Sequence, residues 1–527
     1  MKHLDEGKNS AGGSGGLSAG ELAAKIAAAR EAQRRWAALS YRERSGRLKK
    51  AGRYMACHAG ELVDVIHRDT GKLRLDALAA EVLPAVMALG YYIKQGKRIL
   101  APRKIRGGNI LMFNKKSRII YKPYGVVGII SPWNYPFSIP FSEVVMALLA
   151  GNGVLLKVAS DTPEVGRALA GIFSAADLPE GLFSYVEIPG KEAGPAFISG
   201  GVDKLFFTGS TAVGRELMAL AAPRLLPLVL ELGGADAAIV CSDADLDRAA
   251  AGLVWAGFSN AGQSCGGVQR ILVHQDVYDA FLKKFCALVE GLRPGDGPAA
   301  DLGPMISLRQ KRAVQKQVEA CIAAGAVVAA RSLPEEAAPG DSEGDDPAGL
   351  YAGDSLFAPA LALTQVTEDM PVMTGEIFGP VAALIPVADD QEALRIANRS
   401  SYGLTGSVWS RNSRRAKRIA REIHAGAVMI NDHLMSHGLA ETPWGGFGDS
   451  GIGKTHGEPG FREMCKAQVI VDDILPGVKR NLWWQPYSEQ VFRGMEAILH
   501  LLAGPSLFRR IRAIPGVLQI FFRYWKK

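Results

Sequence analysis

The sequence is poor in cysteine, and its few cysteines are not arranged for a metal or a disulfide framework. Its 527 residues include six cysteines, with no Cys-x-x-Cys pair and no histidine cluster at ligand spacing. This pattern argues against a zinc site and favours a reducing compartment. We therefore expect no metal cofactor and a cytoplasmic location.

The N-terminal residues do not have the pattern that predicts a signal peptide. The N-terminus, MKHLDEGKNSAGGSGG, lacks the apolar run that such a peptide needs. Its glycine and serine content instead predicts a flexible leader over residues 1–17.

Net positive charge is scarce outside the C-terminus. The net charge is +8, and residues 476–527 contain nine Lys and Arg against two glutamates, so the remaining body is almost neutral. A neutral body does not favour nucleic acid as a partner.

The pattern of apolar residues predicts an α/β protein of two or three domains. Ser18 and Ser40 each begin a capping box ahead of a helical stretch. After Tyr124, short apolar runs alternate with helix-compatible segments, at residues 125–130, 154–158, 205–207 and 228–232. Such runs indicate buried parallel strands, and ligands bind at the carboxyl ends of parallel strands.

Polar residues lie at or near the ends of these runs. Asn134 follows the first run and offers an amide donor, and Lys157 lies near the end of the second. The third leads into residues 208–214, a glycine and serine turn before a helix, which suits a phosphate. Glu231 lies within the fourth, and a buried carboxylate is costly unless it has a function.

One cysteine stands in an unusual setting. Phe258 to Arg270 reads FSNAGQSCGGVQR, and Cys265 lies between Gly262 and Gly266. A single cysteine is more often an ordinary buried thiol than a nucleophile. The glycines leave room for close approach by backbone or by a ligand, which a packed core position does not need, and this makes Cys265 a candidate nucleophile.

The ordered set of motifs resembles the NAD(P)-dependent aldehyde dehydrogenase superfamily from roughly Leu22 to Asp473. Each motif is modest, but the series in this order is specific. The motifs are residues 132–136, PWNYP; 207–214, FTGSTAVG; 230–234, LELGG; 258–265, FSNAGQSC; 376–381, EIFGPV; Asn398 with 402–404, YGL; and 443–446, PWGG, with 450–453, SGIG.

The resemblance implies a Rossmann-like cofactor-binding domain, an α/β catalytic domain and a small β oligomerisation arm. The implied limits are 18–116 and 124–232 for the cofactor-binding domain, 233–442 for the catalytic domain, 117–123 and 443–475 for the arm and the end of the body, and 476–527 for the tail. Strands near 118–122 and 467–471 would pair within the arm. A homodimer or homotetramer is implied.

Aldehyde oxidation through a cysteine sets clear chemical needs. A thiolate adds to the carbonyl, the resulting oxyanion needs preorganised donors, and the thioester needs a base to activate water. The resemblance assigns these roles to Cys265, to the Asn134 amide with the Cys265 N–H, and to Glu231.

The resemblance also implies a set of cofactor contacts. Lys157 would face the adenosine ribose, Gly209, Ser210 and Gly214 the pyrophosphate, and Glu376 with Phe378 the nicotinamide ribose; Trp133 and Leu232 complete the set. Ser160 replaces the glutamate of the usual Lys-Pro-Ser-Glu motif. Loss of that carboxylate removes a repulsion of the 2′-phosphate, so we expect NADP to be tolerated or preferred over NAD.

The tail beyond Pro476 is amphipathic and basic. Val491, Met495, Ile498 and Leu502 recur at helical spacing. Basic residues among Trp, Phe and Leu favour a helix in a membrane interface over the alternative, in which the helix packs on its own body or on a partner subunit. The tail is similar in kind to the extensions of fatty aldehyde dehydrogenases, which implies an apolar, medium- to long-chain aldehyde and a peripheral place on a membrane.

Three other functions stay open at this stage. They are oxidation of a small semialdehyde, a CoA-acylating reaction, and an inactive membrane-associated scaffold. Glu231 argues against the CoA-acylating reaction, and the joint presence of Cys265, Glu231, Asn134 and Glu376 argues against the scaffold.

Overall fold

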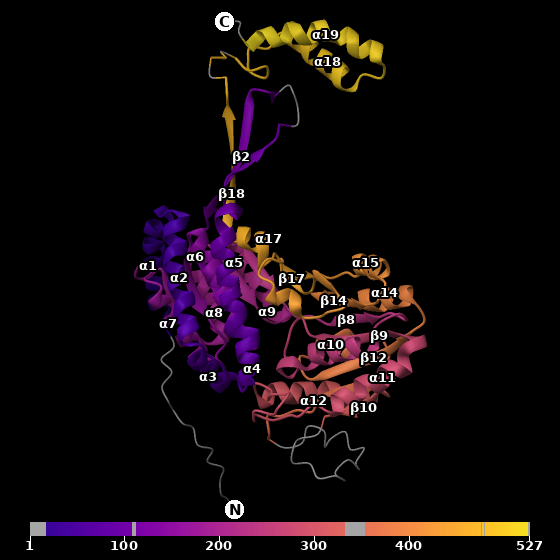
Figure 1. Cartoon of the computed structure of the whole chain (residues 1–527). Coiled ribbons are helices and arrows are strands. Elements are labelled where there is room, and N and C mark those ends of the chain that lie inside the picture. Colours follow the sequence, from indigo (N-terminus) through magenta and orange to yellow (C-terminus); the bar gives the residue numbers. More distant parts are fainter. Residues whose placement is uncertain (1–16, 108–111, 333–353, 476, 479, 525–527) are drawn as a thin grey trace, which may run out of the picture. The chain divides into compact units, whose positions relative to one another are not determined.

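The computed structural model describes residues 17–107, 112–332, 354–475, 477–478 and 480–524. The expected leader lies almost wholly outside the described residues. The chain divides into two compact units, one made of residues 1–100 and 122–466 and the other of residues 101–121 and 467–527 (Figure 1).

The four predicted apolar runs form strands of one largely parallel sheet. Its order is β17 (Gly451–Ile452), β7 (Leu228–Glu231), β6 (Lys204–Thr208), β3 (Val126–Ile130), β4 (Gly153–Lys157) and β5 (Phe183–Tyr185). All neighbours are parallel except β17, which is antiparallel to β7. Strands β3 and β4 are buried throughout, as expected where helices cover both faces of a sheet.

Helices surround this sheet, and both predicted capping boxes are present at their starts. Ser18 accepts a hydrogen bond from the Glu21 N–H and Ser40 one from the Glu43 N–H, each at 3.3 Å. The helices are α1 (Ala19–Ala38), α2 (Tyr41–Cys57), α3 (Ala59–Thr70), α4 (Arg74–Ala77), α5 (Leu83–Ile99), α6 (Ser138–Ala150), α7 (Pro163–Ala175), α8 (Gly190–Gly200) and α9 (Thr211–Ala221), with a π-helical turn at Leu78–Val82 and a 3₁₀ turn at Ala222–Arg224.

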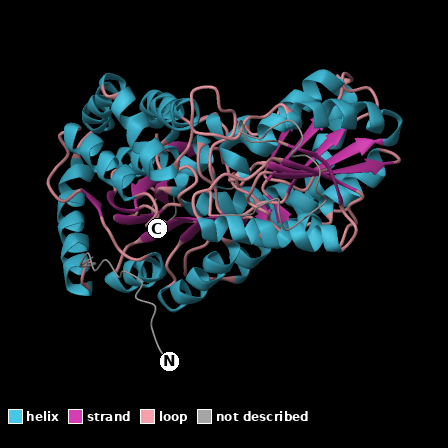
Figure 2. Ribbon diagram, turned by 90° about the horizontal axis from the view of Figure 1, so that it is seen from below, coloured by secondary structure: helices cyan, strands magenta, loops and turns pink. Residues whose placement is uncertain are grey.

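A second sheet forms the core of the part that follows β7. Its order is β10 (Val327–Arg331), β11 (Leu361–Thr364), β12 (Val381–Val387), β9 (Val268–His274), β8 (Asp236–Val240), β14 (Thr405–Trp409) and β15 (Ala427–Ile430). Only the β10–β11 pair is antiparallel among these described strands. Helices flank the strands of both sheets (Figure 2). Those of this part are α10 (Leu246–Phe258), α11 (Gln275–Glu290), α12 (Leu308–Ala323), α13 (Pro371–Thr374), α14 (Asp390–Asn398) and α15 (Ser413–Glu422).

Short elements complete the first unit. They are the 3₁₀ turn at Ser259–Gly262, the paired strands β13 (Tyr402–Gly403) and β16 (Phe447–Gly448), and helices α16 (Met435–Gly438) and α17 (Gly457–Glu463).

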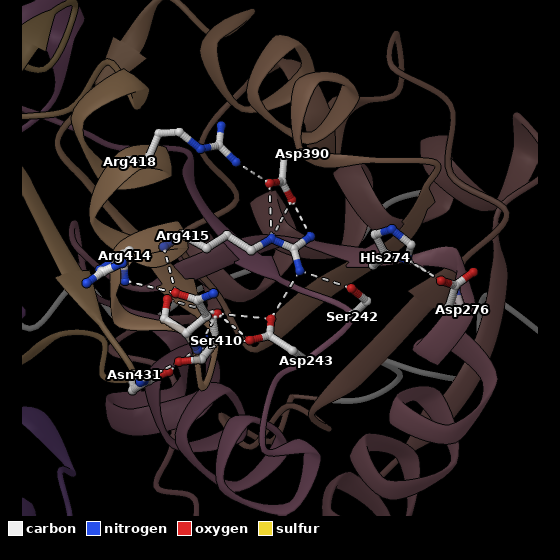
Figure 3. Close-up of polar contacts among 11 residues, drawn as sticks. Ser242, Asp243, His274, Asp276, Asp390, Ser410, Arg414, Arg415, Arg418 and Asn431 are labelled. Carbon is white, nitrogen blue, oxygen red and sulfur yellow. Dashed lines mark hydrogen bonds and ion pairs between the residues drawn. The ribbon is translucent and has the colours of Figure 1, made fainter.

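The carboxyl edge of the second sheet carries an ion-pair cluster (Figure 3). Arg415 donates to Asp390 at 2.6 Å and to Asp243 at 3.1 Å, and Arg418 donates to Asp390 at 2.6 Å. Ser410, which follows β14, donates to Asp243 at 2.9 Å. Because the cations and carboxylates satisfy one another, this edge ties helices to strands and leaves no open ligand site among these residues.

One described helical segment, Arg74–Ile99, is long and apolar enough to cross a membrane by length and composition. Tyr92 and Ile99 on this segment are fully buried, and α5 packs against α6 and α2. One face of this segment therefore packs within the first unit, while Leu83 and Met87 are exposed.

The second unit combines a three-stranded sheet with a helical hairpin. The strand order is β1 (Arg103–Ile105), β2 (Lys115–Pro123) and β18 (Cys465–Asp473), so the two predicted arm strands are neighbours. The hairpin consists of α18 (Glu489–Ala503) and α19 (Leu507–Phe521), followed by a 3₁₀ turn at Phe522–Tyr524.

Two short strands pair outside the domains to which the sequence assigns them. β1 lies in the range 18–116 but joins the arm sheet, and β17 lies in the range 443–475 but joins the first sheet. Both are short, at three and two residues, and pairing of such short segments depends on the neighbouring strand rather than on their own pattern.

Candidate active site

Most of the predicted site residues line one cavity of about 230 Å³ in the first unit. Three predicted residues, Lys157, Ser160 and Gly214, lie outside this lining. The predicted residues in the lining are Trp133, Asn134, Gly209, Ser210, Glu231, Leu232, Cys265, Glu376 and Phe378.

The two sheets present opposite edges to the cavity. Asn134 follows β3, while Thr208 and Glu231 end β6 and β7, so the first sheet contributes its carboxyl edge as predicted. Cys265 and Glu376 come from loops that lead into β9 and β12. The second sheet therefore contributes its amino edge.

Cys265 is half-buried in a tightly packed loop ahead of β9. Gly262 has a φ of 67°, and a Cβ there would lie 2.1 Å from the Gly379 carbonyl oxygen. Only glycine fits such a position, so this glycine serves close backbone packing of the loop.

The surroundings of the cysteine disfavour the thiolate. Burial, and then the carboxyl groups of Glu376, Asp236 and Glu231, raise the pKa of the Cys265 thiol well above its ordinary value. The backbone N–H of Gly266 acts in the opposite direction. The thiol is therefore protonated at neutral pH in this structure, and it needs a proton acceptor or a positive charge beside it to react.

The Asn134 side chain is fixed against the cysteine loop. Its Nδ2 donates to the carbonyl oxygen of Gln263 at 3.0 Å, while its Oδ1 is buried with no hydrogen-bond partner in the described chain. One N–H of the amide stays free to meet an oxyanion.

A buried ion pair supports the turn that carries Asn134. Lys72 donates to Glu81 at 2.7 Å and to the Asn134 carbonyl oxygen at 2.8 Å. Glu81 accepts from the N–H groups of Phe137 and Ser138 at 3.0 and 2.9 Å. Nothing in the local sequence at Lys72 or Glu81 indicates this pair.

Glu231 is a buried carboxyl group at the end of β7. It is 4% exposed, and neither oxygen has a hydrogen-bond partner in the part of the chain that the structure describes. Burial and the nearby Glu143 raise the pKa of Glu231 well above its ordinary value, while Lys454 lowers it. Burial raises the pKa of Glu143 to about 8. A carboxyl group in this state is a stronger base than a solvated glutamate, which suits activation of water.

The residues after β6 form a cradle at the N-terminus of α9. The Ser210 side chain caps this 11-residue helix by accepting from the Val213 N–H. A Cβ on Gly214 would lie 2.7 Å from Leu232, so glycine allows the helix to approach that residue. The Thr208 hydroxyl oxygen is buried without a partner among the described residues. These groups fit a phosphate-bearing cofactor.

Lys157 and Ser160 lie at the carboxyl end of β4. Lys157 is 5% exposed, and burial lowers the pKa of its ammonium. No hydrogen bond from this ammonium is found within the described chain, so it is free to meet a hydroxyl or a phosphate. Ser160 is exposed in the following turn.

Glu376 and Phe378 form another wall of the cavity. Glu376 accepts from the Gly234 N–H at 3.1 Å, and burial raises its pKa to about 7. The Phe378 ring meets the edge of the Trp133 ring at 5.3 Å. Gln310, which the sequence analysis missed, lines the cavity and donates to the Phe378 carbonyl oxygen at 3.0 Å.

Comparison with known proteins decides the family. Residues 15–470 match the model of the aldehyde dehydrogenase family. The chain belongs to the aldehyde dehydrogenase family. It is therefore an NAD(P)-dependent oxidoreductase that acts on aldehydes, as its motifs predict.

Two curated relatives match almost the full chain. A 4,4'-diapolycopene aldehyde oxidase of Methylomonas sp is 34% identical over 94% of this chain and 90% of its own length. A Mycolicibacterium smegmatis protein provisionally named succinate-semialdehyde dehydrogenase (NADP(+)) is 36% identical over 89% of each chain. The family model ends at residue 470, so the Methylomonas match extends beyond it into the C-terminal part.

A solved structure shows the same fold. The structure described as an NADP dependent enzyme of E. coli superposes with a TM-score of 0.79, at 30% identity, over 86% of this chain and 90% of its own. The predicted aldehyde dehydrogenase fold is confirmed.

Proposed function

We propose that this aldehyde dehydrogenase oxidises an apolar, medium- to long-chain aldehyde to its carboxylic acid through a covalent bond to Cys265. The observation that carries the covalent route is the convergence of Cys265, Asn134 and Glu231 on one cavity. The substrate class rests on the apolar surface of the C-terminal hairpin.

Cys265 acts first. Its thiol gives its proton to water and the sulfur bonds to the aldehyde carbon, which turns the carbonyl oxygen into an oxyanion. The free N–H of Asn134 and the N–H of Cys265 donate to that oxygen. Hydride then leaves the same carbon, the carbonyl reforms, and a thioester remains on Cys265.

Glu231 acts in the second half of the reaction. Its carboxylate takes a proton from water as the water oxygen attacks the thioester carbon. The carbon–sulfur bond breaks, the acid is released, and the cysteine sulfur leaves as a thiolate. Asn134 again donates to the oxyanion that forms at the carbonyl oxygen.

NAD or NADP would bind in the cradle after β6. Gly209, Ser210 and the N-terminus of α9 would hold the pyrophosphate, Lys157 a ribose hydroxyl, and Glu376 the nicotinamide ribose. Gly214 and Leu232 shape the cradle, while Trp133 and Phe378 would bound the site. When bound in its oxidised form, the cofactor supplies the hydride acceptor and a positive charge near the thiol.

NADP is tolerated or preferred, because Ser160 offers a hydroxyl where a carboxylate would repel a 2′-phosphate. We expect the wild-type kcat/KM with NADP to be at least about one tenth of that with NAD. Ser160→Glu should lower kcat/KM with NADP by at least about tenfold and leave that with NAD within about threefold. Steady-state kinetics with each cofactor measures this.

Asp161 provides the matched control for Ser160, since it is the neighbouring side chain and its charge acts on Lys157. Asp161→Asn should not reduce the use of NADP. A wild-type preference for NAD of several orders of magnitude would contradict the proposal.

The C-terminal hairpin has an apolar inner face and an apolar outer face. Leu482, Ile498, Val517 and Ile520 form the buried core between its helices. Large apolar side chains on the outer face are 41–73% exposed: Phe492, Leu499 and Leu502 on α18, and Leu507, Phe508, Ile511, Ile514, Leu518 and Phe522 on and after α19. A surface of this kind marks an interaction site.

We propose that this outer face meets an anionic membrane surface. On α19 the exposed residues Phe508, Ile511, Ile514 and Leu518 follow one another at steps of three and four, which gives one continuous face. Arg509, Arg510 and Arg512 are exposed on the same helix, and residues 507–524 contain no acidic residue. Cations beside an apolar helix face suit anionic lipid, and lipid is the phase in which long-chain aldehydes accumulate.

The triple change Phe508→Ser, Ile511→Ser and Leu518→Ser should lower binding to anionic vesicles by at least about 100-fold, because each side chain contributes about 1.5–3 kcal/mol on burial. Wild-type kcat/KM should rise with aldehyde chain length, and vesicles should raise the rate with long-chain aldehydes but not with short ones. The variant should lose that vesicle effect while keeping its rate with short aldehydes.

Leu225→Ser is the matched control, since Leu225 is 88% exposed in the first unit. It should leave vesicle sedimentation unchanged. A profile that peaks at a small semialdehyde would favour the second substrate class, which the name of the Mycolicibacterium relative supports. Vesicle binding that survives the triple change would instead mean that the hairpin packs on protein.

Homo-oligomers would form through the arm, as a dimer or a tetramer. In the three-stranded sheet β18 is an edge strand, and its Val469 and Val471 are 56% and 59% exposed. Edge strands of this length readily pair with another chain. We place the enzyme in the cytoplasm, with the hairpin on the inner face of a membrane.

A further inference from the structure

A buried imidazole lies behind the catalytic loop and has no role in the chemistry above. His433 is 1% exposed and follows β15, in the loop that leads to α16. Its Nε2 lies 3.1 Å from the Gly266 carbonyl oxygen, and its Nδ1 lies 2.8 Å from the Ser407 hydroxyl oxygen. The histidine therefore joins β14 to the residue that directly follows Cys265.

The partners of His433 fix where its proton lies. A carbonyl oxygen can only accept, so Nε2 carries the hydrogen and donates it to Gly266. Nδ1 must then accept from the Ser407 hydroxyl. This direction is allowed because Ser407 itself accepts from the Trp409 indole N–H at 3.1 Å.

Two further observations define the donor to Gly266. Thr405 also lies 3.3 Å from the Gly266 oxygen, but it donates at 2.8 Å to the Asp236 carboxyl group. The shorter contact to a carboxyl group takes the single hydroxyl hydrogen. In addition, burial lowers the pKa of His433 to about 4, so the imidazole stays neutral at working pH. Among the described residues, His433 is thus the main hydrogen-bond donor to this carbonyl.

The peptide that His433 holds closes the turn around the nucleophile. The Gly267 N–H donates to the Ser264 carbonyl oxygen at 3.1 Å, which makes a turn with Cys265 and Gly266 at its centre. The Gly266 carbonyl and the Gly267 N–H belong to one peptide group. Ser264 therefore holds one end of that peptide, and His433 holds the other.

Residue 266 has no side chain of its own to fix it. A Cβ there would lie 2.8 Å from the Trp444 ring and 3.2 Å from Thr405, so the packing requires glycine. A glycine has wide backbone freedom, and its orientation here depends on the hydrogen bonds of its peptide groups. Its own N–H lowers the pKa of the Cys265 thiol and so favours the thiolate.

We infer that His433 is a positioning residue that holds the Cys265–Gly266 turn so that the Gly266 N–H stays directed at the sulfur. This inference rests on the proposed role of Cys265 as the nucleophile. The imidazole is not among the residues that line the cavity, and it acts through the peptide that it binds.

The test compares His433→Leu with His433→Gln in the full-length enzyme. Leucine removes the donor, whereas the Gln Nε2 reaches about the same point as the imidazole Nε2 and can still donate to Gly266. Iodoacetamide labelling of Cys265, followed over pH and assigned by peptide mass, reports thiolate formation directly.

The leucine variant should label about tenfold more slowly at a given pH, and its labelling profile should move to higher pH. Its kcat should fall by about tenfold or more, while KM for NAD(P) should change less than about twofold. The glutamine variant should regain labelling and kcat to within about threefold of wild type. Circular dichroism and NAD(P) binding establish that each variant is folded.

Two results would overturn the inference. One is a wild-type labelling profile in the folded leucine variant. The other is a glutamine variant as impaired as the leucine variant, because the hydrogen bond would then not be what matters. A Cys265→Ala enzyme that still turned over would instead refute the proposed function itself, whichever way the His433 variants behaved.

Discussion

Cys265→Ala is expected to lower kcat for aldehyde oxidation by about 10,000-fold or more, with the fold and cofactor binding intact. Removal of the nucleophile leaves no atom that can form the covalent bond, and loss of such a residue typically has an effect of this size. The side chain is half-buried in a loop, and alanine removes one sulfur from the cavity wall. Formation of reduced cofactor, measured with saturating aldehyde and NAD(P), gives the rate.

Cys286→Ala is the matched control, because Cys286 is also an unpaired, half-buried cysteine. It lies on α11, away from the cavity lining, and its substitution should leave kcat within about twofold. Comparable losses in the two variants, or near wild-type turnover of Cys265→Ala, would contradict the covalent mechanism.

Glu231→Gln is expected to separate the two halves of the reaction. Oxidation of the aldehyde to the thioester on Cys265 should continue and release about one equivalent of reduced cofactor per active site. Steady turnover should then be about 100- to 10,000-fold slower than in wild type. The amide keeps the shape of the carboxyl group but cannot take the proton from water. Rapid-mixing kinetics shows the burst, and intact-mass measurement shows the acyl group on Cys265.

The pH dependence follows from the raised pKa of Glu231. Only the carboxylate accepts a proton, so wild-type hydrolysis of the thioester should fall as pH drops through this raised pKa, at a higher pH than for a solvated glutamate. The glutamine variant should lose that pH dependence. Glu143→Gln should shift the wild-type fall in rate to lower pH, since the charge of Glu143 raises the pKa of Glu231. Loss of the burst in Glu231→Gln, with no acyl group on Cys265, would mean that Glu231 is required before the thioester forms.

The strands and helix starts can be predicted from the sequence because apolar runs and capping residues act through neighbours in the chain. Four apolar runs became parallel strands, and two serines cap helices as expected. The rule that ligands lie at carboxyl ends of strands located Asn134 and Glu231. It could not locate Cys265 and Glu376, which precede their strands, since the sequence does not state which edge of the second sheet faces the first.

In the tail, the sequence did not predict which helix face is buried. Its periodicity found a stripe of Val491, Met495, Ile498 and Leu502, yet Ile498 is buried between the helices while Leu502 is 51% exposed. Both faces of the hairpin are apolar, and periodicity alone cannot tell which face a neighbouring helix covers.

The sequence by itself determined the family, the α/β class, the strand order along the chain and the candidate nucleophile, because these depend on motifs and on residues close together in the chain. Only the tertiary structure brought Lys72 to the turn of Asn134, Glu143 to Glu231, and His433 to the peptide after Cys265, across 167 positions of sequence in the last case. Those contacts arise when two sheets and their helices pack, and burial then sets the protonation and hydrogen bonding of each group.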